Sequence, residues 1–110
     1  MGWKADMVYD VIFTDTAEAQ AQQLIQYLLF ELENTQAACH VEQDMKETVR
    51  RLSHIAASLK LCDHPMLHSL GYRMIHFKRH NYFMLYKIIE QRVYIVGIYH
   101  DLQDFENLLK

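Results

Sequence analysis

The stretch LGYRMIHFKRHNYFMLYKIIEQRVYIVGIYH, Leu70 to His100, decides the fold of this chain. Tyrosine, phenylalanine, isoleucine and valine dominate it, a composition typical of strands with a pleated, half-buried surface. Two short polar segments, residues 78–81 and 90–91, interrupt it and predict tight turns. Segments joined so closely can only pair as antiparallel neighbours. The predicted strands are Tyr72–Phe77, Tyr82–Ile89 and Arg92–Tyr99.

The second and third of these strands are apolar on both of their alternating faces. Tyr82, Met84 and Tyr86 lie on one face of the second strand, and Phe83 and Leu85 lie on the other. A strand exposed to water on one face would alternate apolar and polar residues. We therefore expect both strands to be central in the sheet, with each face at least partly covered.

A further strand and a first helix precede this stretch. Met7–Phe13 alternates apolar and polar residues as a strand does. Asp15 followed by Glu18 predicts a capping box at a helix N-terminus. The first helix then runs to about Glu33, with a buried apolar stripe that includes Leu28 and Leu32.

The second predicted helix covers roughly Gln36–Leu59, with Thr35 as its N-cap. Its apolar residues recur at alternating intervals of three and four, as in a coiled-coil seam, which predicts an antiparallel hairpin of the two helices. Basic residues on its outer face are interleaved with acidic ones, so a solvated surface is favoured there over an RNA-binding one. The basic residues are Lys46, Arg50, Arg51 and His54.

The connection Lys60–Ser69 is predicted to be irregular. Cysteine, histidine and aspartate side chains in it have the chemistry of zinc ligands, but their spacing matches no closed zinc motif. We therefore predict no metal and no cofactor. The side chains concerned are Cys62, Asp63, His64 and His68.

A short C-terminal helix is predicted after Asp101, its expected N-cap, with an apolar stripe from Leu102 to Leu109. The expected order is then an N-terminal strand, an antiparallel helical hairpin, a three-stranded antiparallel meander and a short C-terminal helix. Two helices against a small, mainly antiparallel sheet define the α+β class.

Composition bounds the class of protein. The chain has 110 residues, 51% hydrophobic and 23% charged, which predicts one soluble globular domain spanning residues 1–110. Its net charge of −3 argues against a strong general affinity for nucleic acid. Two cysteines make no disulfide framework, and neither a secretion signal nor a membrane-spanning stretch is evident. We expect a cytoplasmic protein that does not associate with membranes.

Several short motifs follow one another in a distinctive order. They are Phe13-Thr14 before an alanine-rich helix, Gly71-Tyr72-Arg73, Asn81-Tyr82 with Leu85-Tyr86, Val93-Tyr94-Ile95, Ile98-Tyr99-His100 and Gln103-Asp104. In order and spacing they resemble the RelE/ParE superfamily of bacterial toxins, the toxic halves of type II toxin–antitoxin pairs. The resemblance covers nearly the whole chain.

The resemblance implies a RelE/ParE-like fold and a cognate antitoxin, with which the chain would form a hetero-oligomer. It also implies one of two targets. RelE-like members enter the ribosome and cut mRNA by activating a ribose 2′-hydroxyl, whereas ParE-like members inhibit DNA gyrase without cutting RNA. The retained His100 favours the first, so we expect a toxin of the plasmid-stabilisation type that cleaves mRNA on the ribosome. The alternative is a gyrase inhibitor, or a catalytically degenerate toxin that only binds its antitoxin.

Cleavage by 2′-hydroxyl attack needs a base, a cation for the developing phosphorane charge and an acid for the leaving oxygen. His100 is the candidate base and Arg73 the candidate phosphate contact. The places where RelE-like enzymes carry arginines hold Phe83 and Leu102, which favours the alternative function. The candidate residues for binding RNA or another target are Lys78, Arg79, His80, Tyr82, Tyr86 and Tyr99.

Each candidate also has a purely structural interpretation. Exposure on a turn tip explains Lys78, Arg79 and His80 without any function. Packing in the core or at its rim explains Tyr82 and Tyr86. A hydrogen bond to the backbone at a strand end explains His100, and a plain surface position explains Arg73.

Overall fold

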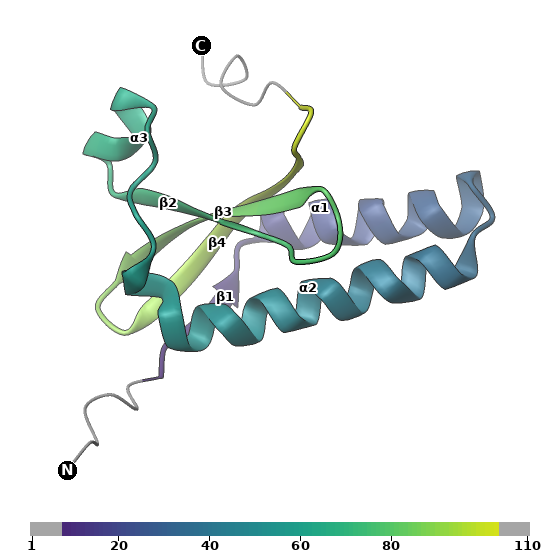
Figure 1. Ribbon diagram of the computed structural model, residues 1–110, viewed down its shortest axis with the longest axis horizontal. Coiled ribbons are helices and arrows are strands. Elements are labelled where there is room, and N and C mark those ends of the chain that lie inside the picture. Colours follow the sequence, from purple (N-terminus) through teal and green to yellow (C-terminus); the bar gives the residue numbers. More distant parts are fainter. Residues whose placement is uncertain (1–7, 104–110) are drawn as a thin grey trace.

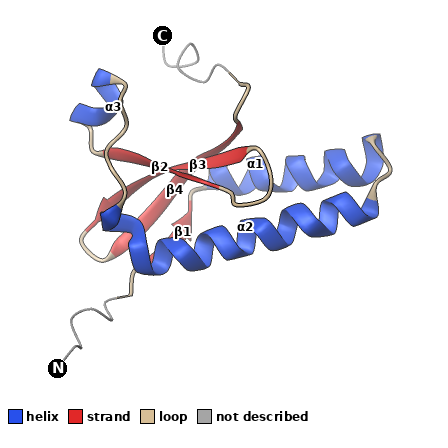
Figure 2. Ribbon diagram, viewed as in Figure 1, coloured by secondary structure: helices blue, strands red, loops and turns tan. Residues whose placement is uncertain are grey.

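The computed structural model describes residues 8–103, which form an α+β fold with a four-stranded sheet and a long helical hairpin (Figure 1). Helices and strands are distinguished by colour in Figure 2. The elements are β1 (Asp10–Phe13), α1 (Asp15–Gln26), η2 (Tyr27–Glu31), α2 (Thr35–Ile55), η3 (Ala56–Ser58), α3 (Pro65–Ser69), β2 (Tyr72–His76), β3 (Tyr82–Ile89) and β4 (Arg92–His100).

The sheet has the strand order β1-β4-β3-β2. The predicted antiparallel meander is confirmed: β3 has its predicted bounds, β2 ends one residue early and β4 continues one residue further. β1 begins later than predicted, at Asp10, and runs parallel to β4. Leu85 pairs with Gly97 and Tyr86 with Ile95, so Val96 is an extra residue in β4, a bulge that bends the strand.

The helical hairpin covers one sheet face, as predicted. Leu52 of α2, Ala17 of α1 and the sheet residues Met84, Tyr86 and Ile95 are each 0% exposed and belong to one apolar cluster. These sheet residues alternate along their strands with residues of the other face, which is the period of a pleated strand. The hairpin and the sheet therefore share the main core.

The second sheet face has a smaller core. Phe83 and Leu85 of β3 pack there with Leu67 of α3 and Cys62 of the preceding loop. This cluster confirms that both faces of the central strands are covered. It also corrects the prediction for Lys60–Ser69, since residues 65–69 form a short helix, with Pro65 at a position where proline is favoured.

Both long helices are capped by the residue before the one predicted. The side chain of Thr14 accepts a hydrogen bond from the Ala17 amide at 3.2 Å, so Thr14 and not Asp15 is the N-cap of α1. Asn34 accepts from the Ala37 amide at 3.0 Å and caps α2, where Thr35 was predicted. Adjacent residues with side-chain oxygens are chemically equivalent as caps, so only the backbone geometry decides between them.

The first helix does not continue unbroken to Glu33. Its last turn, η2, is a π-helix in which the amide of Leu32 donates to the carbonyl of Tyr27, five residues back, at 3.1 Å. A π turn holds one residue more than an α turn, so the residues that follow it are rotated by about 100° around the helix axis. Leu28 stays buried, but Leu32, predicted to lie in the buried stripe, is 53% exposed.

The second helix ends at Ile55, four residues before the predicted Leu59, and η3 follows it. Beyond β4, residues 101–103 form a turn, and the rest of the predicted C-terminal helix lies outside the described residues. Between residues 8 and 103, no helix has both the length and the apolar character needed to cross a bilayer.

Candidate functional site

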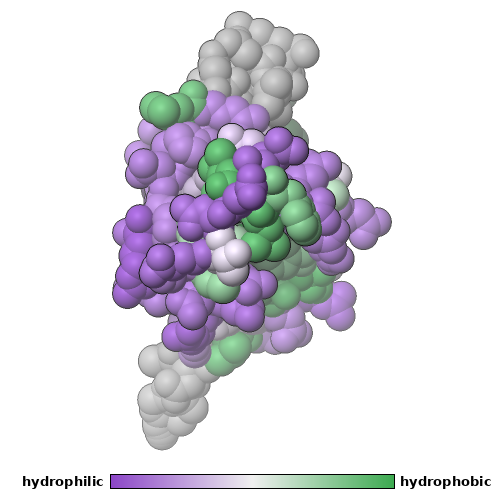
Figure 3. Space-filling model, turned by 90° about the vertical axis from the view of Figure 1, so that its right-hand side faces the viewer, coloured by the Kyte–Doolittle hydropathy of each residue, from purple (hydrophilic) through white to green (hydrophobic). Residues whose placement is uncertain are grey.

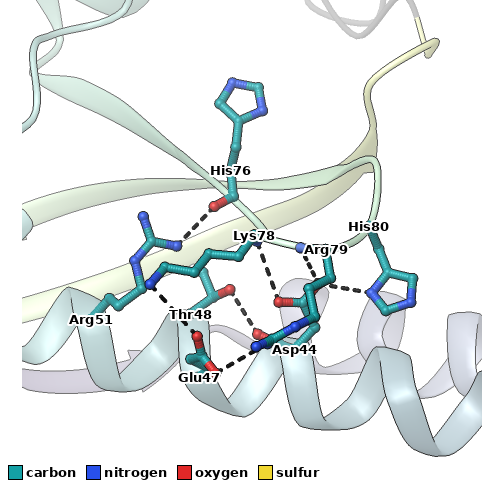
Figure 4. A network of polar contacts seen from close by, with 8 residues as sticks. All are labelled: Asp44, Glu47, Thr48, Arg51, His76, Lys78, Arg79 and His80. Carbon is teal, nitrogen blue, oxygen red and sulfur yellow. Dashed lines mark hydrogen bonds and ion pairs between the residues drawn. The ribbon is translucent and has the colours of Figure 1, made fainter.

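The loop between β2 and β3 carries three of the predicted target-binding residues, and the carboxylate of Asp44 fastens this loop to α2 (Figure 4). Asp44 accepts hydrogen bonds from the backbone amides of Lys78 at 3.3 Å and Arg79 at 2.9 Å. Its Oδ2 lies 2.7 Å from Nδ1 of His80. The side chain of Asp44 is 1% exposed, so the loop is tied to a group inside the protein.

The charge state of Asp44 follows from these contacts. Burial of the carboxyl raises its pKa, but the hydrogen bonds from His80, Arg79 and Lys78 together outweigh burial and lower the pKa below the usual value. An ionised carboxylate has no proton to donate, so Nδ1 of His80 carries the proton of their contact. Asp44 therefore fixes both the orientation and the tautomer of the His80 ring.

Glu47, one turn further along α2, engages the cations of the same loop. Its carboxylate lies 3.3 Å from the guanidinium of Arg79 and 3.8 Å from the ammonium of Lys78. The two cationic side chains remain 67% and 56% exposed, so they can still reach a partner. A surface cleft of 540 Å³ lies between loop and helix, lined by His40, Gln43, Asp44, Glu47, Arg79 and His80.

His100 lies at the other side of the hairpin, where β4 ends. Its ring meets that of Tyr82 edge-on, with 5.1 Å between ring centroids. The two residues share a cleft of 330 Å³ with side chains of α1 and η2. Burial raises the pKa of the Tyr82 hydroxyl, and Tyr27 adds to the increase. The cleft is lined by Gln20, Gln23, Leu24, Tyr27, Tyr82, Ile98, His100 and Gln103.

The hydrogen bond at His100 limits its chemistry. Nδ1 accepts from the amide of Leu102 at 3.0 Å, so the proton of the neutral ring sits on Nε2. In this geometry Nδ1 is already engaged and Nε2 carries the proton, whereas a general base must offer a free lone pair.

Arg73 is turned toward the end of α2. Its guanidinium donates to the carbonyl of Ala57 at 3.3 Å and to that of Leu59, and so satisfies backbone groups after the last helical turn. Tyr86, the cross-strand neighbour of Arg73, donates its hydroxyl to the carbonyl of Ala56 at 2.7 Å. Tyr86 is 0% exposed, so its side chain is part of the core and does not reach the protein surface.

The two predicted catalytic residues are separated along the sheet. Arg73 lies opposite Tyr86 on β3, and His100 lies opposite Tyr82, four residues along the same strand. At about 3.4 Å per residue this separates their positions by roughly 13 Å along the strand direction. Each is also engaged by backbone groups, so the described residues do not assemble them into one site.

Phe83 and Leu102 stand at the positions where the RelE-like resemblance implies arginines. Phe83 is 4% exposed in the second core, with its ring 5.6 Å from that of Tyr99 between centroids. Leu102 is 89% exposed. Tyr99 lies on the same sheet face as Phe83 and is half-buried, close over the Cα of Gly97.

The side chains of the loop before β2 that have the chemistry of zinc ligands make other contacts. Cys62 is buried in the second core, and its carbonyl oxygen lies 3.2 Å from Nδ1 of His68. Within residues 8–103, no three histidine, cysteine or acidic side chains are grouped as metal ligands.

Sequence reasoning missed Asp44, the residue that organises the loop. The signal was an acidic residue three positions after Val41 and four before Thr48, within the buried stripe of α2. A buried carboxylate requires hydrogen-bond partners, so its position alone indicated a polar contact on the sheet side.

The family of the chain is decided by its sequence. The profile of a family described as "ParE toxin of type II toxin-antitoxin system, parDE" matches residues 11–105. The chain belongs to this ParE toxin family. The resemblance to the RelE/ParE superfamily is thereby confirmed, and the toxin class with it.

The fold agrees with the family. The chain is similar to a solved structure described as "Chromosomal ParDE TA system from P. aeruginosa", with a TM-score of 0.69 and 18% identity. The similarity covers 86% of this chain and 98% of that one, which confirms the RelE/ParE-like fold of this ParE-family chain. No curated protein sequence matches it.

Proposed function

We propose that this ParE-family chain arrests growth by binding its target protein, DNA gyrase, and not by cutting mRNA. The observation that carries the proposal is the separation of Arg73 from His100, with each side chain held by backbone groups. Phosphorane chemistry needs a cation and a base around one phosphate. A chain that keeps the fold without that arrangement is better suited to inhibition by contact.

The proposal includes an antitoxin as a second protein partner. Membership of a toxin family of type II systems supports it, and so does the similarity to a structure described as a ParDE toxin–antitoxin system. A stable complex of this kind would bury about 1,600 Å² or more. Both gyrase and an antitoxin would place the chain in the cytoplasm.

A supercoiling assay beside a translation assay tests the proposal. The purified chain should block supercoiling of relaxed plasmid by gyrase and leave mRNA intact in a translation extract. His100→Gln should inhibit gyrase as the wild type does. Cleavage of mRNA by the wild type, reduced about 100-fold or more in His100→Gln, would contradict the proposal and assign the base to His100.

Cleavage of mRNA on the ribosome remains the second candidate, because one observation favours it. Tyr82 and His100 line the same cleft, where the doubly protonated form of the His100 ring would be a suitable acid for a leaving oxygen. In that case Lys78 and Arg79 would contribute the cations that hold the RNA. This function would be favoured if the wild type cleaves mRNA and does not inhibit gyrase, and if Tyr82→Phe and His100→Gln both lose the cleavage.

A further inference from the structure

The tip of the helical hairpin exposes three large apolar side chains. Phe30 is 72% exposed, Leu32 53% and Tyr27 51%. All three come from η2 and the residue directly after it. Seen from the hairpin end, the molecule shows apolar side chains uncovered among polar ones (Figure 3). We call Tyr27, Phe30 and Leu32 the tip patch.

Local backbone geometry creates the tip patch. An unbroken α-helix would have kept Leu32 in the buried stripe with Leu28, and the π turn rotates it outward. The far ends of α1 and α2 extend beyond the sheet, so the tip projects from the body of the protein (Figure 1). An apolar patch that is presented in this way is typical of a protein interaction site.

Charge is divided unequally between the two halves of the chain. Residues 8–45 contain seven aspartates and glutamates and no lysine or arginine, whereas residues 46–103 contain nine lysines and arginines and four acidic residues. Exposed Glu31 and Glu33 flank Leu32 at the tip itself. The tip patch therefore has an acidic rim, and a complementary partner surface must be basic.

The backbone conformation of Glu33 allows a matched test of this surface. Its φ is 49°, in the left-handed region, where a side chain is disfavoured and glycine is readily accommodated. Glu90, in the turn between β3 and β4, has a similar φ of 58°. Two exposed glutamates in the same strained conformation, one at the tip and one remote from it, form a matched pair for experiment.

We propose that the tip patch and its glutamates dock on the target protein, in an apolar pocket rimmed by lysine and arginine side chains. This inference rests on the proposed function, because it names the surface through which the chain reaches its target. Phe30, the most exposed of the three, would enter the pocket, as buried aromatic anchors do at interfaces. Glu31 and Glu33 would steer and orient the encounter.

Matched substitutions test the proposal. Phe30→Ser should raise the concentration for half-inhibition of gyrase supercoiling at least ~10-fold, the scale of an interface hot spot. Ile89→Ser, at an apolar residue that is 50% exposed on β3, should leave it unchanged. Glu33→Gly should raise the half-inhibition concentration several-fold and weaken the salt dependence of inhibition, whereas Glu90→Gly should change neither. Circular dichroism and binding to the antitoxin encoded beside the gene serve as controls.

The outcomes separate this inference from the proposed function. If all variants inhibit gyrase as strongly as the wild type does, the tip patch is not the docking surface, and the proposed function is unaffected. Loss of antitoxin binding in Phe30→Ser or Glu33→Gly would assign the tip to the antitoxin and overturn the inference as well.

A wild-type chain that arrests growth without inhibiting gyrase would refute gyrase as the target. Growth arrest by the same variants would then decide whether the tip patch is the docking surface. Loss of arrest in the tip variants alone would support docking on another target, and equal arrest would overturn it. A wild type with neither effect would overturn both proposals.

Discussion

Replacing Asp44 should loosen the loop between β2 and β3 and destabilise the whole fold. Asp44→Ala removes three hydrogen bonds to a buried carboxylate, from His80 and the amides of Lys78 and Arg79. Hydrogen bonds to charged groups contribute about 1.5–3 kcal/mol each, and removing one partner of a buried pair costs about 3–5 kcal/mol. The loop is at the surface, where water can reach the released donors, so we expect the lower end, about 3 kcal/mol.

Urea unfolding followed by circular dichroism measures this loss. Asp44→Asn keeps one acceptor oxygen and should lose about 2 kcal/mol, since the hydrogen bonds lose their charge. In a double-mutant cycle with His80→Ala, Asp44 and His80 should show a coupling energy of about 1–2 kcal/mol. A loss below about 0.5 kcal/mol in Asp44→Ala would refute the view that this carboxylate anchors the loop.

Acid titration gives an independent check. The pKa of Asp44 is lowered in the folded state, so its ionised form stabilises the fold. This contribution is complete above the unfolded-state pKa of about 3.9 and is lost as the pH falls through the lower pKa of the folded state. Wild-type stability should therefore fall more steeply than that of Asp44→Asn below about pH 4. Equal slopes would mean that Asp44 is not held ionised.

Three further substitutions test the fold. Tyr86→Phe should lose about 1 kcal/mol in urea unfolding, because it leaves the buried carbonyl of Ala56 without its donor. Burial raises the pKa of Tyr86 above its unfolded-state value of about 10. Its contribution to the free energy of unfolding is therefore complete below about pH 10 and is lost at higher pH. Absorbance at about 295 nm should show that this phenol ionises only as the protein unfolds. Gly97→Ala places a Cβ 2.6 Å from the ring of Tyr99 and should lower the melting temperature, whereas in a Tyr99→Ala background the same substitution should lower it much less. Asn34→Ala removes the N-cap of α2 and should lose about 1 kcal/mol, and an unchanged midpoint would refute its role as cap.

The strands could be predicted because their residues decide them locally. β3 pairs on both sides and packs on both faces, and its composition shows this without knowledge of the rest of the chain. The helix caps were each missed by one residue, at Thr14 and Asn34, since neighbouring side chains compete for the same amides. The π turn has no comparable signal, because the apolar spacing fits an unbroken α-helix through Leu32.

The site was harder to predict because its residues depend on where distant elements end. A second helix that reaches Leu59, as the sequence predicts, leaves the guanidinium of Arg73 available for a phosphate. Since α2 ends at Ile55, carbonyl groups are released next to β2, and the guanidinium binds them. Asp44 and His80 are 36 positions apart, and no local pattern connects them. Residue type was informative here, but the partner of each residue was set by the tertiary structure.

Phe83, at a position where the RelE-like resemblance implies an arginine, is part of the second core. Phe83 packs with Leu85, Leu67 and Cys62 in the second core and is 4% exposed. An arginine in its place would carry an unpaired charge into an apolar cluster, at a penalty of several kcal/mol. Phe83→Arg alone should therefore destabilise the fold without creating a phosphate site. An arginine-based phosphate site here would require the second core, α3 and the position of Arg73 to change together, which agrees with the protein-contact inhibition that we propose.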